Sequence, residues 1–568
     1  MKKLIEMMLE KKVFAFLIIF VITLGGIFAY KNLKIDVFPD PSPMLVQIYT
    51  HAEGMAPEEV EKFVSYPIET SLYGLPHVKK INSLSTFGLS TVSVYFEDKV
   101  DIYFARQLVA QQLLGIKEKL PEFAEAPELG PISTGLGMVY VYTVQSTETA
   151  TPGTEKNNQE LLQGGQGPSI LELRTLQDWV IKFQLQTVPG IAAVKSHGGD
   201  IKQFHVIVDP DKLLKYKLVL HDVMERINAS SKNITAGYIT RNKEEYLVRG
   251  IGLLEEIDAL KKVLVKESGA TPIFLENIAE VKVGSAIKRG EAILNRQGPV
   301  VSGIVLKLIG VNTAELIEKI DKRVAEINTG LPKGIRLVPV YNQALIIKAA
   351  FKTVSEALII GIILVSLILF IFINDLSSVL VSTLAIPFAV FTAFIAMKAA
   401  NMTADLMSFG GLAIGIGLLV DATIVVVENI SRNRDLYKNK KSDKKIILHS
   451  INQVLRPLLY AMAMIILSFL PILTLQDTEG KLFRPFGFSL LVAIISAIVY
   501  ALFFSPVLMS AFGTRRLKGK EATAGNKPAS SGIVFEYLKK IYLKIFDFFY
   551  KKESLTILVF LLIFLISI

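Results

Sequence analysis

The stretch that decides the fold runs from Met407 to Val427 and reads MSFGGLAIGIGLLVDATIVVV. It is long enough to cross a bilayer as a helix, which takes about 20 mainly apolar residues. Its one charged residue is Asp421, and placing a carboxylate at that depth costs roughly 2.5–3.5 kcal/mol or more. A side chain that binds and releases a proton in mid-membrane indicates proton-coupled work. The alternative is a buried aspartate that hydrogen-bonds a neighbouring helix for packing.

The composition is that of an integral membrane protein. Of the 568 residues 51% are hydrophobic, and they are concentrated in a few long blocks. The chain has no Cys, which excludes disulfides, thiolate metal sites and a Cys nucleophile. The net charge of +10 does not indicate nucleic acid, because much of the basic excess lies beside the hydrophobic spans, where it orients a membrane protein. We therefore expect a lipid bilayer around this chain and no nucleic-acid partner.

Charges beside the apolar blocks predict the topology. Residues 1–30 are expected to hold a cytoplasmic N-terminus and an uncleaved first transmembrane helix, because the apolar run Val13–Tyr30 is too long for a signal-peptide core and no cleavage site follows it. The basic loop 429–456 is expected in the cytoplasm, by its excess of Lys and Arg and by the number of crossings that precede it. Transmembrane helices two to six are expected within 346–515, near 354–373, 377–397, 405–428, 457–475 and 486–512.

The polar block 31–345 is expected on the opposite side of the membrane, which in a Gram-negative cell is the periplasm. Strand and helix patterns recur in it in the same order, which predicts an α+β region of ferredoxin-like βαβ subdomains. Residues about 231–290 are expected to form a small β-rich docking insert. In the second repeat, strands near Ala192–His197 and Gln203–Val208 are expected to pair across a turn at Gly198-Gly199.

The C-terminal part begins with a linker and an amphipathic helix, at 516–552. The segment Ile533–Lys552 is rich in aromatic and basic residues, which predicts a helix along the inner membrane surface, with a partner-binding helix as the alternative. Residues 553–568 indicate the start of a truncated seventh transmembrane helix, because Leu555–Ile568 is too short to span a bilayer unaided. We therefore expect the front half of a longer protein. Thr147–Ser169 is expected to be a flexible surface loop.

Local motifs add a family resemblance. They are Asp36-Val37-Phe38-Pro39-Asp40, Gly54–Glu69 (GMAPEEVEKFVSYPIE), Leu384–Pro387, Gly410–Asn429 (GGLAIGIGLLVDATIVVVEN), Phe469-Leu470-Pro471, Gly480–Pro485 (GKLFRP) and Ser505-Pro506-Val507-Leu508. In this order along the chain they resemble the resistance–nodulation–division (RND) efflux pumps of Gram-negative inner membranes. The resemblance covers the whole chain.

The resemblance implies an activity and a set of partners. RND pumps are homotrimers of chains about twice as long as this one, and they exchange periplasmic protons for exported substrate. They dock a periplasmic adaptor (membrane fusion) protein and an outer-membrane channel. The chain would be the N-terminal half of such an antiporter and not an enzyme. No cofactor is expected, and the sequence has no P-loop of the GxxxxGK[ST] kind that would support ATP hydrolysis.

The subclass can be argued from the fourth span. Drug exporters of this family typically carry two adjacent aspartates there, whereas Asp421 is followed by Ala422, which resembles the heavy-metal branch. The stretches Ser133–Val144 (STGLGMVYVYTV) and Leu173–Asp178 (LRTLQD) also resemble that branch. The alternatives are export of drugs or other hydrophobic compounds, and a non-transporting half-pump that serves as an assembly or binding module.

The residues leave the identity of a metal open. In Cu(I)/Ag(I) pumps methionines are expected in the fourth span, because soft thioethers suit soft ions, yet Leu419 and Val426 occupy two of those positions and only Met407 matches. In Zn/Co/Cd pumps an aspartate is expected where this chain has Gly415. Substrate-binding and metal-binding residues therefore stay unidentified by sequence.

Asp421 is the predicted proton carrier, with Glu428 as a second member of the relay. Glu428 lies seven residues on, about two helical turns, so it shares a face with Asp421 and would extend a proton path toward the cytoplasm. The alternative for Glu428 is an interfacial position near Arg432. The partner of Asp421, a Lys or an acid, is expected from the missing half.

Other polar residues carry weaker hypotheses. His197 and His205 flank the Gly198-Gly199 turn, so strand pairing could bring them together as metal ligands, although a surface hairpin explains them as well. Met402 and Met407, at the outer end of the fourth span, could hold a soft ion, with core packing as the alternative. Asp375, between the second and third spans, is interpreted as a solvated loop residue.

Overall fold

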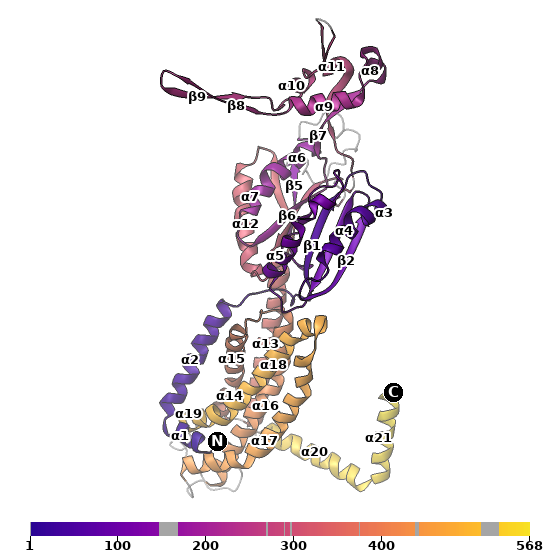
Figure 1. Cartoon of the computed structure of the whole chain (residues 1–568). Helices are drawn as coiled ribbons and strands as arrows, with labels where there is room; N and C mark the ends of the chain where they lie inside the picture. The colour runs from indigo at the N-terminus through magenta and orange to yellow at the C-terminus, as the bar shows by residue number, and fades with distance from the viewer. Residues whose placement is uncertain are drawn as a thin grey trace. The chain divides into compact units, whose positions relative to one another are not determined.

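The computed structural model describes residues 2–146, 168–268, 271–288, 290–295, 298–373, 375–437, 442–512 and 533–567 (Figure 1). The predicted loop Thr147–Ser169 and the predicted linker that starts at residue 516 fall almost entirely outside these ranges. The chain divides into two compact units. The first comprises residues 1–137, 308–317 and 343–568, and the second comprises residues 138–307 and 318–342.

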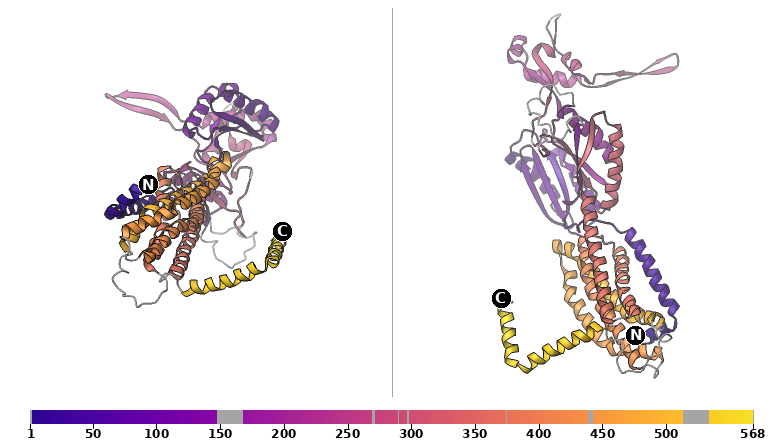
Figure 2. Two further views of the ribbon diagram at one scale, coloured as in Figure 1. Left: turned by 90° about the horizontal axis from the view of Figure 1, so that it is seen from below. Right: turned by 180° about the vertical axis from the view of Figure 1, so that it is seen from behind.

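Six helical segments among the described residues are long and apolar enough to cross a membrane, and they overlap the spans expected from the sequence. Figure 2 shows the ribbon of these helices from two further sides. They are α2 (Lys12–Lys31), α13 (Gln343–Ile373), α14 with α15 (Leu376–Thr383 and Ala385–Ala399), α16 (Leu406–Leu436), α17 (Asp443–Thr474), and α18 with α19 (Asp477–Val499 and Ser505–Phe512). A short helix α1 (Lys2–Glu10) precedes them and buries Ile5, Met8 and Leu9 in the bundle core. The expected helical membrane bundle is therefore confirmed.

Small residues set the helix packing, as expected in lipid, where apolar side chains gain nothing by leaving the solvent. On α2, a Cβ atom at Gly26 would lie 2.3 Å from Cβ of Phe391 on α15. On α16, a Cβ atom at Gly411 would lie 2.3 Å from the carbonyl oxygen of Phe486 on α18. Only glycine permits so close an approach, so these two positions determine how α2 and α16 lie in the bundle.

The first unit also holds an α+β subdomain. Its strands are β1 (Met44–His51), β2 (Val78–Thr86), β3 (Leu89–Phe96) and β4 (Glu128–Leu129), and its helices are α3 to α4 (Pro57–Leu72) and α5 (Ile102–Leu113). The strands lie in the order β2-β3-β1-β4. β1 and β3 are antiparallel, with Met44 opposite Phe96. This is the split-βαβ arrangement that the sequence predicts.

The second unit repeats this arrangement around its own sheet. Its strands are β5 (Met138–Ser146), β6 (Ile191–His197), β13 (Val301–Lys307) and β14 (Ile335–Asn342), and its helices are α6 to α7 (Ile170–Gln186) and α12 (Thr313–Gly330). The order β14-β5-β13-β6 is equivalent to that of the first sheet. Each repeat has a left-handed residue just before its second strand, His77 (φ 62°) in one and Gly190 (φ 104°) in the other. The predicted internal repeat, and with it the α+β part of the fold class, is confirmed.

The predicted pairing of Ala192–His197 with Gln203–Val208 is wrong. Both strands exist, but β6 pairs with β13, whereas β7 (Lys202–Val208) pairs with β12 (Ala279–Ser285). His197 lies opposite Ser302 and His205 lies opposite Lys282, so strand pairing does not join the two histidines. The cause is an insertion between the second and third strands of this repeat, where the first repeat has only the tight turn between β2 and β3.

The insertion between β6 and β13 has a core of its own. After β7 come α8 (Pro210–Tyr216), α9 (Leu220–Ser230), β8 (Ile234–Arg241), β9 (Glu244–Gly250), α10 (Ile257–Lys261), β10 (Leu264–Ser268), β11 (Thr271–Phe274), α11 (Leu275–Ile278) and β12. The core is built around Val223, Ile273 and Leu275. The β8–β9 hairpin leaves this core as a long ribbon (Figure 1). Tyr238 and Leu247 on this hairpin are exposed.

The last described helices are α20 (Ile533–Lys551) and α21 (Glu553–Ser567). α20 is the amphipathic helix expected here, and it stacks Tyr542, Phe546 and Tyr550 along one side. These side chains are exposed. Such a surface is typical of a helix that lies on a membrane, and that location stays a prediction.

Candidate functional site

A buried aspartate fixes the start of α16, the helix that carries Asp421. Asp405 forms a capping box: its Oδ1 accepts from the backbone N–H of Ser408 at 2.8 Å, and Ser408 Oγ accepts from the backbone N–H of Asp405 at 2.9 Å. Asp405 and Ser408 are both fully buried. Asp405 is absent from the sequence-based candidates, although Asp-x-x-Ser at the start of an apolar run is a capping signal that could have found it.

One face of α16 is filled by the rest of the bundle. This closed face consists of Gly411, Gly415, Ala422 and Val426, with the two glycines against α18. A Cβ atom at Gly415 would lie 3.3 Å from Leu490 Cδ1. The GxxxG spacing therefore acts here as it does in other membrane helix pairs, by letting two backbones approach closely.

A second face of α16 is open along the middle of the helix. Its exposed residues, spaced by three or four positions, are Ile414, Gly417, Asp421, Val425 and Glu428. No described atom lies within 4 Å of the position that a Cβ atom would take at Gly417. We call these five residues the open face. It places Asp421 and Glu428 on one side of the helix, as their spacing indicates.

The open face cannot remain as it is in a membrane. No residue in the described ranges forms a hydrogen bond or ion pair with the Asp421 or Glu428 carboxylate. A charged side chain that faces hydrocarbon at mid-depth costs roughly 2.5–3.5 kcal/mol or more. Two acids on one stripe of a spanning helix therefore require protein or water against that stripe.

Beyond Glu428, a buried amide cluster ties α16 to α17. Asn429 Nδ2 donates to the Ser450 carbonyl oxygen at 2.8 Å and to Gln453 Oε1 at 3.0 Å. Asn433 Nδ2 donates to Gln453 Oε1 at 2.8 Å and to Ser450 Oγ at 3.0 Å. Arg432, the expected neighbour of Glu428, donates to Asn429 Oδ1 at 3.2 Å. This cluster, which the sequence does not signal, holds the far end of α16 in place.

Two charged residues near this end are structural. Asp375, interpreted from sequence as a solvated loop residue, is half-buried and caps α14, accepting from Ser378 N–H at 3.2 Å and Ser378 Oγ–H at 2.6 Å. That interpretation is therefore wrong. Arg434 forms a two-point ion pair with Asp443, at 2.7 and 2.8 Å, and donates to the Met509 carbonyl oxygen at 3.0 Å. This geometry joins α16, α17 and α19.

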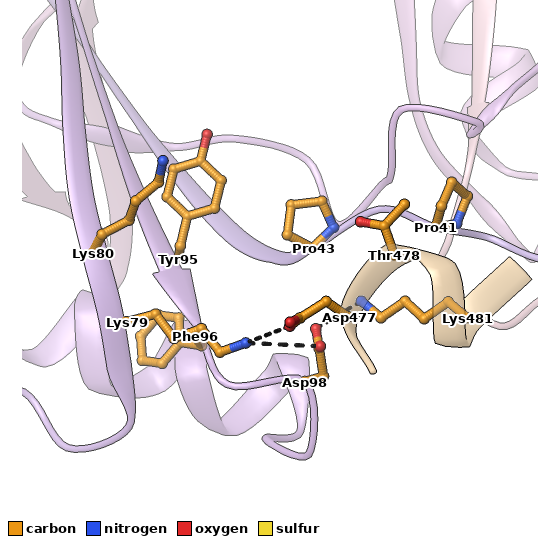
Figure 3. A pocket seen from close by; sticks show the side chains of 10 residues that line it. All are labelled: Pro41, Pro43, Lys79, Lys80, Tyr95, Phe96, Asp98, Asp477, Thr478 and Lys481. Carbon is orange, nitrogen blue, oxygen red and sulfur yellow. Dashed lines mark hydrogen bonds and ion pairs between the residues drawn. The ribbon is translucent and has the colours of Figure 1, made fainter. Parts of the chain in front are cut away.

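A pocket of about 140 Å³ lies at the start of α18, beside the sheet of the first unit (Figure 3). Lys481 Nζ donates to Asp98 Oδ1 at 2.6 Å and to the Ser42 carbonyl oxygen at 2.8 Å. Lys79 Nζ lies 3.4 Å from Asp477 Oδ1 and 3.9 Å from Asp98 Oδ2. The hydrogen bond from Lys481 holds the pKa of Asp98 below its usual range. Lys79 and Lys481 are thus paired with the two aspartates of this pocket, and these ion pairs link α18 to the sheet.

No metal centre emerges from the usual ligands. Within the described ranges, no group of three or more His, Cys, Asp or Glu residues is placed to hold an ion. Met402 packs against an apolar cluster that includes Met397 and Phe409, in line with the packing alternative. Met407 is half-buried. The described part of the chain therefore identifies no His, Cys, Asp or Glu ligand set for a metal substrate.

The chain is similar to curated proteins, among them one named for metal resistance and one named for cation efflux. It is 36% identical over 528 residues to protein HelA of Legionella pneumophila, covering 92% of this chain and 49% of that protein. It is 35% identical over 529 residues to the cobalt-zinc-cadmium resistance protein CzcA of Cupriavidus metallidurans, and 32% identical over 530 residues to the cation efflux system protein CusA of Escherichia coli, in both cases covering 92% of this chain and 48% of the relative. The chain spans about half the length of these relatives.

The fold comparison agrees. A crystal structure of a heavy metal efflux pump superposes with a TM-score of 0.77 at 29% identity, over 91% of this chain and 50% of that one. CzcA and CusA are resistance and efflux proteins by name, in agreement with the prediction of a transporter rather than an enzyme. The AcrB/AcrD/AcrF family matches residues 4–568. The chain therefore belongs to the AcrB/AcrD/AcrF family of RND efflux pumps, and its resemblance to the heavy-metal branch is confirmed.

Proposed function

We propose that this chain is the N-terminal half of a proton-driven exporter of heavy-metal cations. One observation carries the proposal: a helix long enough to span the membrane presents Asp421 and Glu428 on an open face. Because the chain spans about half of its relatives, a second half of similar architecture is the natural cover for that face. A Lys or an acid from that half would stand opposite Asp421.

Protonation of Asp421 would drive the transport cycle. A protonated carboxyl carries no charge. Proton binding would therefore change which arrangement of α16 against the second half is favoured. A proton that moves down a potential of 100 mV releases about 2.3 kcal/mol. At about 1.4 kcal/mol per tenfold concentration ratio, that energy sustains a substrate gradient of roughly fiftyfold. Glu428, two turns away on the same face, would pass the proton on toward the cytoplasm.

The closed face would carry the movement of α16 to its neighbours. Gly411 and Gly415 leave no gap between α16 and α18, and Ser489 Oγ on α18 donates to the Ser408 carbonyl oxygen at 2.7 Å. A displacement of α16 would therefore move α18 with it. At its start α18 is bonded to the first sheet through Lys481 and Asp98. The two βαβ subdomains would then alternate access to the substrate.

The setting follows from the family. RND pumps work in the inner membrane, so the βαβ region would lie in the periplasm and the basic end of the bundle in the cytoplasm. The working unit would be a homotrimer that docks a periplasmic adaptor and an outer-membrane channel. The insertion between β6 and β13, which overlaps the insert expected at 231–290, would take part in that docking.

The substrate class rests on the relatives. CzcA is named for cobalt, zinc and cadmium, and another relative, CnrA of Cupriavidus metallidurans, is named for nickel and cobalt. A metal cation is therefore the proposed substrate here.

Growth tests separate these possibilities. The complete pump, meaning this chain with the second half that its gene or operon supplies, would be expressed in a metal-sensitive, efflux-deficient host. Growth would be scored on Zn, Co, Ni, Cu and Ag and on a drug panel. We expect resistance to at least one metal, lost in Asp421→Asn and kept in the same-face control Val425→Ile at equal expression. Drug resistance without metal resistance would overturn the substrate class, and full resistance in Asp421→Asn would overturn the proton role.

A further inference from the structure

The short segment after α2 lies against the start of α16. Residues Lys34–Val37, which we call the strap, run parallel to Ala404–Leu406: Ala404 N–H donates to the Lys34 carbonyl oxygen at 2.8 Å, and Asp36 N–H donates to the Ala404 carbonyl oxygen at 3.2 Å. Leu406 N–H donates to the Val37 carbonyl oxygen at 3.1 Å. The strap is therefore bonded to the residues that begin the helix of Asp421.

The strap also holds the start of α12. Ile35 N–H donates to Asn312 Oδ1 at 3.3 Å, and the Thr313 hydroxyl donates to the Asp36 carboxylate. Thr313 is fully buried and is the first residue of α12. Val37 is also buried, with 5% of its surface exposed. One extended segment thus bonds to the first residues of two helices, one in the bundle and one that enters the α+β region.

α12 is built to carry a displacement onward. Its first residues, 313–317, belong to the first unit, and the helix continues to Gly330 in the second unit. There Ile320 is fully buried, and Asn328 is bonded in both directions to the backbone of Leu337 on β14, at 2.7 and 3.3 Å. An α-helix rises only 1.5 Å per residue with every interior backbone group bonded, so it transmits movement along its axis with little loss.

We infer that the strap couples proton binding on α16 to movement of α12, with Asp36 as its positioning residue. This inference rests on the proposed function. The strap has no slack, because α2 ends at Lys31 and the first strap bond is made at Lys34. Three hydrogen bonds hold the strap to the start of α16, and two hold it to the start of α12. The strap would therefore hold while the bundle rearranges, and pull α12 with it.

Two variants weaken the α12 side of the strap and leave the α16 side intact. Thr313→Val removes the hydroxyl at nearly constant shape, and Asn312→Ala removes the acceptor for Ile35. Asp36→Asn keeps an oxygen that can accept from Thr313 but removes the negative charge, so it should lose less metal export than Thr313→Val. Thr329→Val makes the same exchange of hydroxyl for methyl at the exposed end of α12, where Thr329 bonds only to its own helix, and serves as the matched control.

The test measures protons and metal separately in the complete pump, reconstituted in vesicles with an imposed pH difference. Zn²⁺, Co²⁺, Ni²⁺, Cu⁺ and Ag⁺ would each be supplied alone. We expect Thr313→Val to lose metal export at least tenfold while proton entry continues, and we expect Asp421→Asn to abolish that proton entry. Thr329→Val should keep both fluxes. Proton flux without metal flux is the signature of uncoupling, which mere loss of folded pump would not give.

The outcomes separate the strap from the proposed function. Thr313→Val and Asn312→Ala with normal metal export would overturn the strap and leave the proposed function standing. Equal loss of both fluxes in a well-folded Asn312→Ala variant would also overturn the strap, because it would show a structural role only. If the unmodified pump shows no proton entry that depends on Asp421, the proposed function fails, and the strap inference fails with it.

Discussion

The closed and open faces of α16 each contain glycine, but the surroundings of the glycines differ. Gly411, on the closed face, leaves room for the Phe486 carbonyl oxygen, 2.3 Å from where a Cβ atom would be. At Gly417, six residues on, none of the atoms that the structure describes lies within 4 Å of that position. The closed face is thus determined by packing inside this chain. The open face carries two acids, Asp421 and Glu428, and therefore requires protein or water against it in a membrane.

The largest effect should come from crowding the closed face. Gly411→Leu would force a side chain into the backbone of α18, which must then move. Overpacking a tight core commonly costs about 1–3 kcal/mol and sometimes more, and here the obstacle is backbone rather than a flexible side chain. We expect little folded protein, measured as the monodisperse fraction in detergent and as the temperature of unfolding.

Gly417→Leu is the matched comparison for that variant. The substitution is the same and the helix is the same, but the chain offers open space at residue 417. Exchanging a helical glycine for leucine should even favour the helix by about 0.5–1 kcal/mol. We therefore expect this half, produced alone, to fold as well as the unmodified chain. Equal yields for Gly411→Leu and Gly417→Leu would break the distinction between the two faces.

A second expectation for Gly417→Leu concerns the complete pump. If a second half covers the open face, a leucine at residue 417 would stand between that half and Asp421. We expect metal resistance to fall several-fold, less than for Asp421→Asn, while this half alone stays folded. The measurement is growth over a metal concentration series at matched expression.

The control for this experiment is Gly361→Leu on α13. Nothing lies within 4 Å of a Cβ atom at Gly361 either, but its neighbours Ile360 and Leu364 are exposed and apolar, as on a lipid-facing helix. Resistance should be unchanged in this variant. Equal losses for Gly361→Leu and Gly417→Leu would contradict the view that the open face meets a specific protein surface.

Much of the fold can be predicted from the sequence, because local patterns determine it. The six spans follow from runs of apolar residues that no soluble core would need. The repeat can be recognised because helix and strand patterns recur in order, with Pro76-His77 and Pro189-Gly190 each just before a second strand. The shared face of Asp421 and Glu428 follows from helical periodicity alone.

The errors arise where pairing is not local. β6 is followed at once by β7, so the sequence predicts a hairpin of these two strands. The partner of β6 is instead β13, which starts at Val301, after the whole insertion. The residues of β6 and β7 do not indicate that a folded insertion stands where the first repeat has a tight turn. The surroundings of the open face cannot be predicted from this sequence for another reason: the residues expected to cover it do not belong to this stretch of chain.

The smallest effect on stability is expected at the start of α18, the helix that packs on the closed face of α16, where Lys481 contacts Asp98 beside the first sheet. Lys481→Met removes the hydrogen bond to Asp98. The side chains of Lys481 and Asp98 are 27% and 33% exposed, so the loss of stability should stay below about 1 kcal/mol. Lys481 lowers the pKa of Asp98 in the folded state, so the contribution is present above the unfolded value near 3.9 and is lost as the pH falls through the folded pKa. The difference in unfolding temperature between Lys481→Met and the unmodified chain should be constant from pH 5 to 8 and shrink below about pH 4.

Lys79→Met removes the 3.9 Å contact to Asp98 and a more exposed 3.4 Å contact to Asp477; it is the control and should shift the unfolding temperature less. A Lys481→Met penalty that changes between pH 5 and 8 would mean that the charges at the start of α18 titrate in the working range of the pump. The closed side would then respond to protons as the open face is proposed to do. A constant penalty would show that the ion pair of Lys481 with Asp98 takes no part in the proton response, which is proposed for the open face, where Asp421 lies.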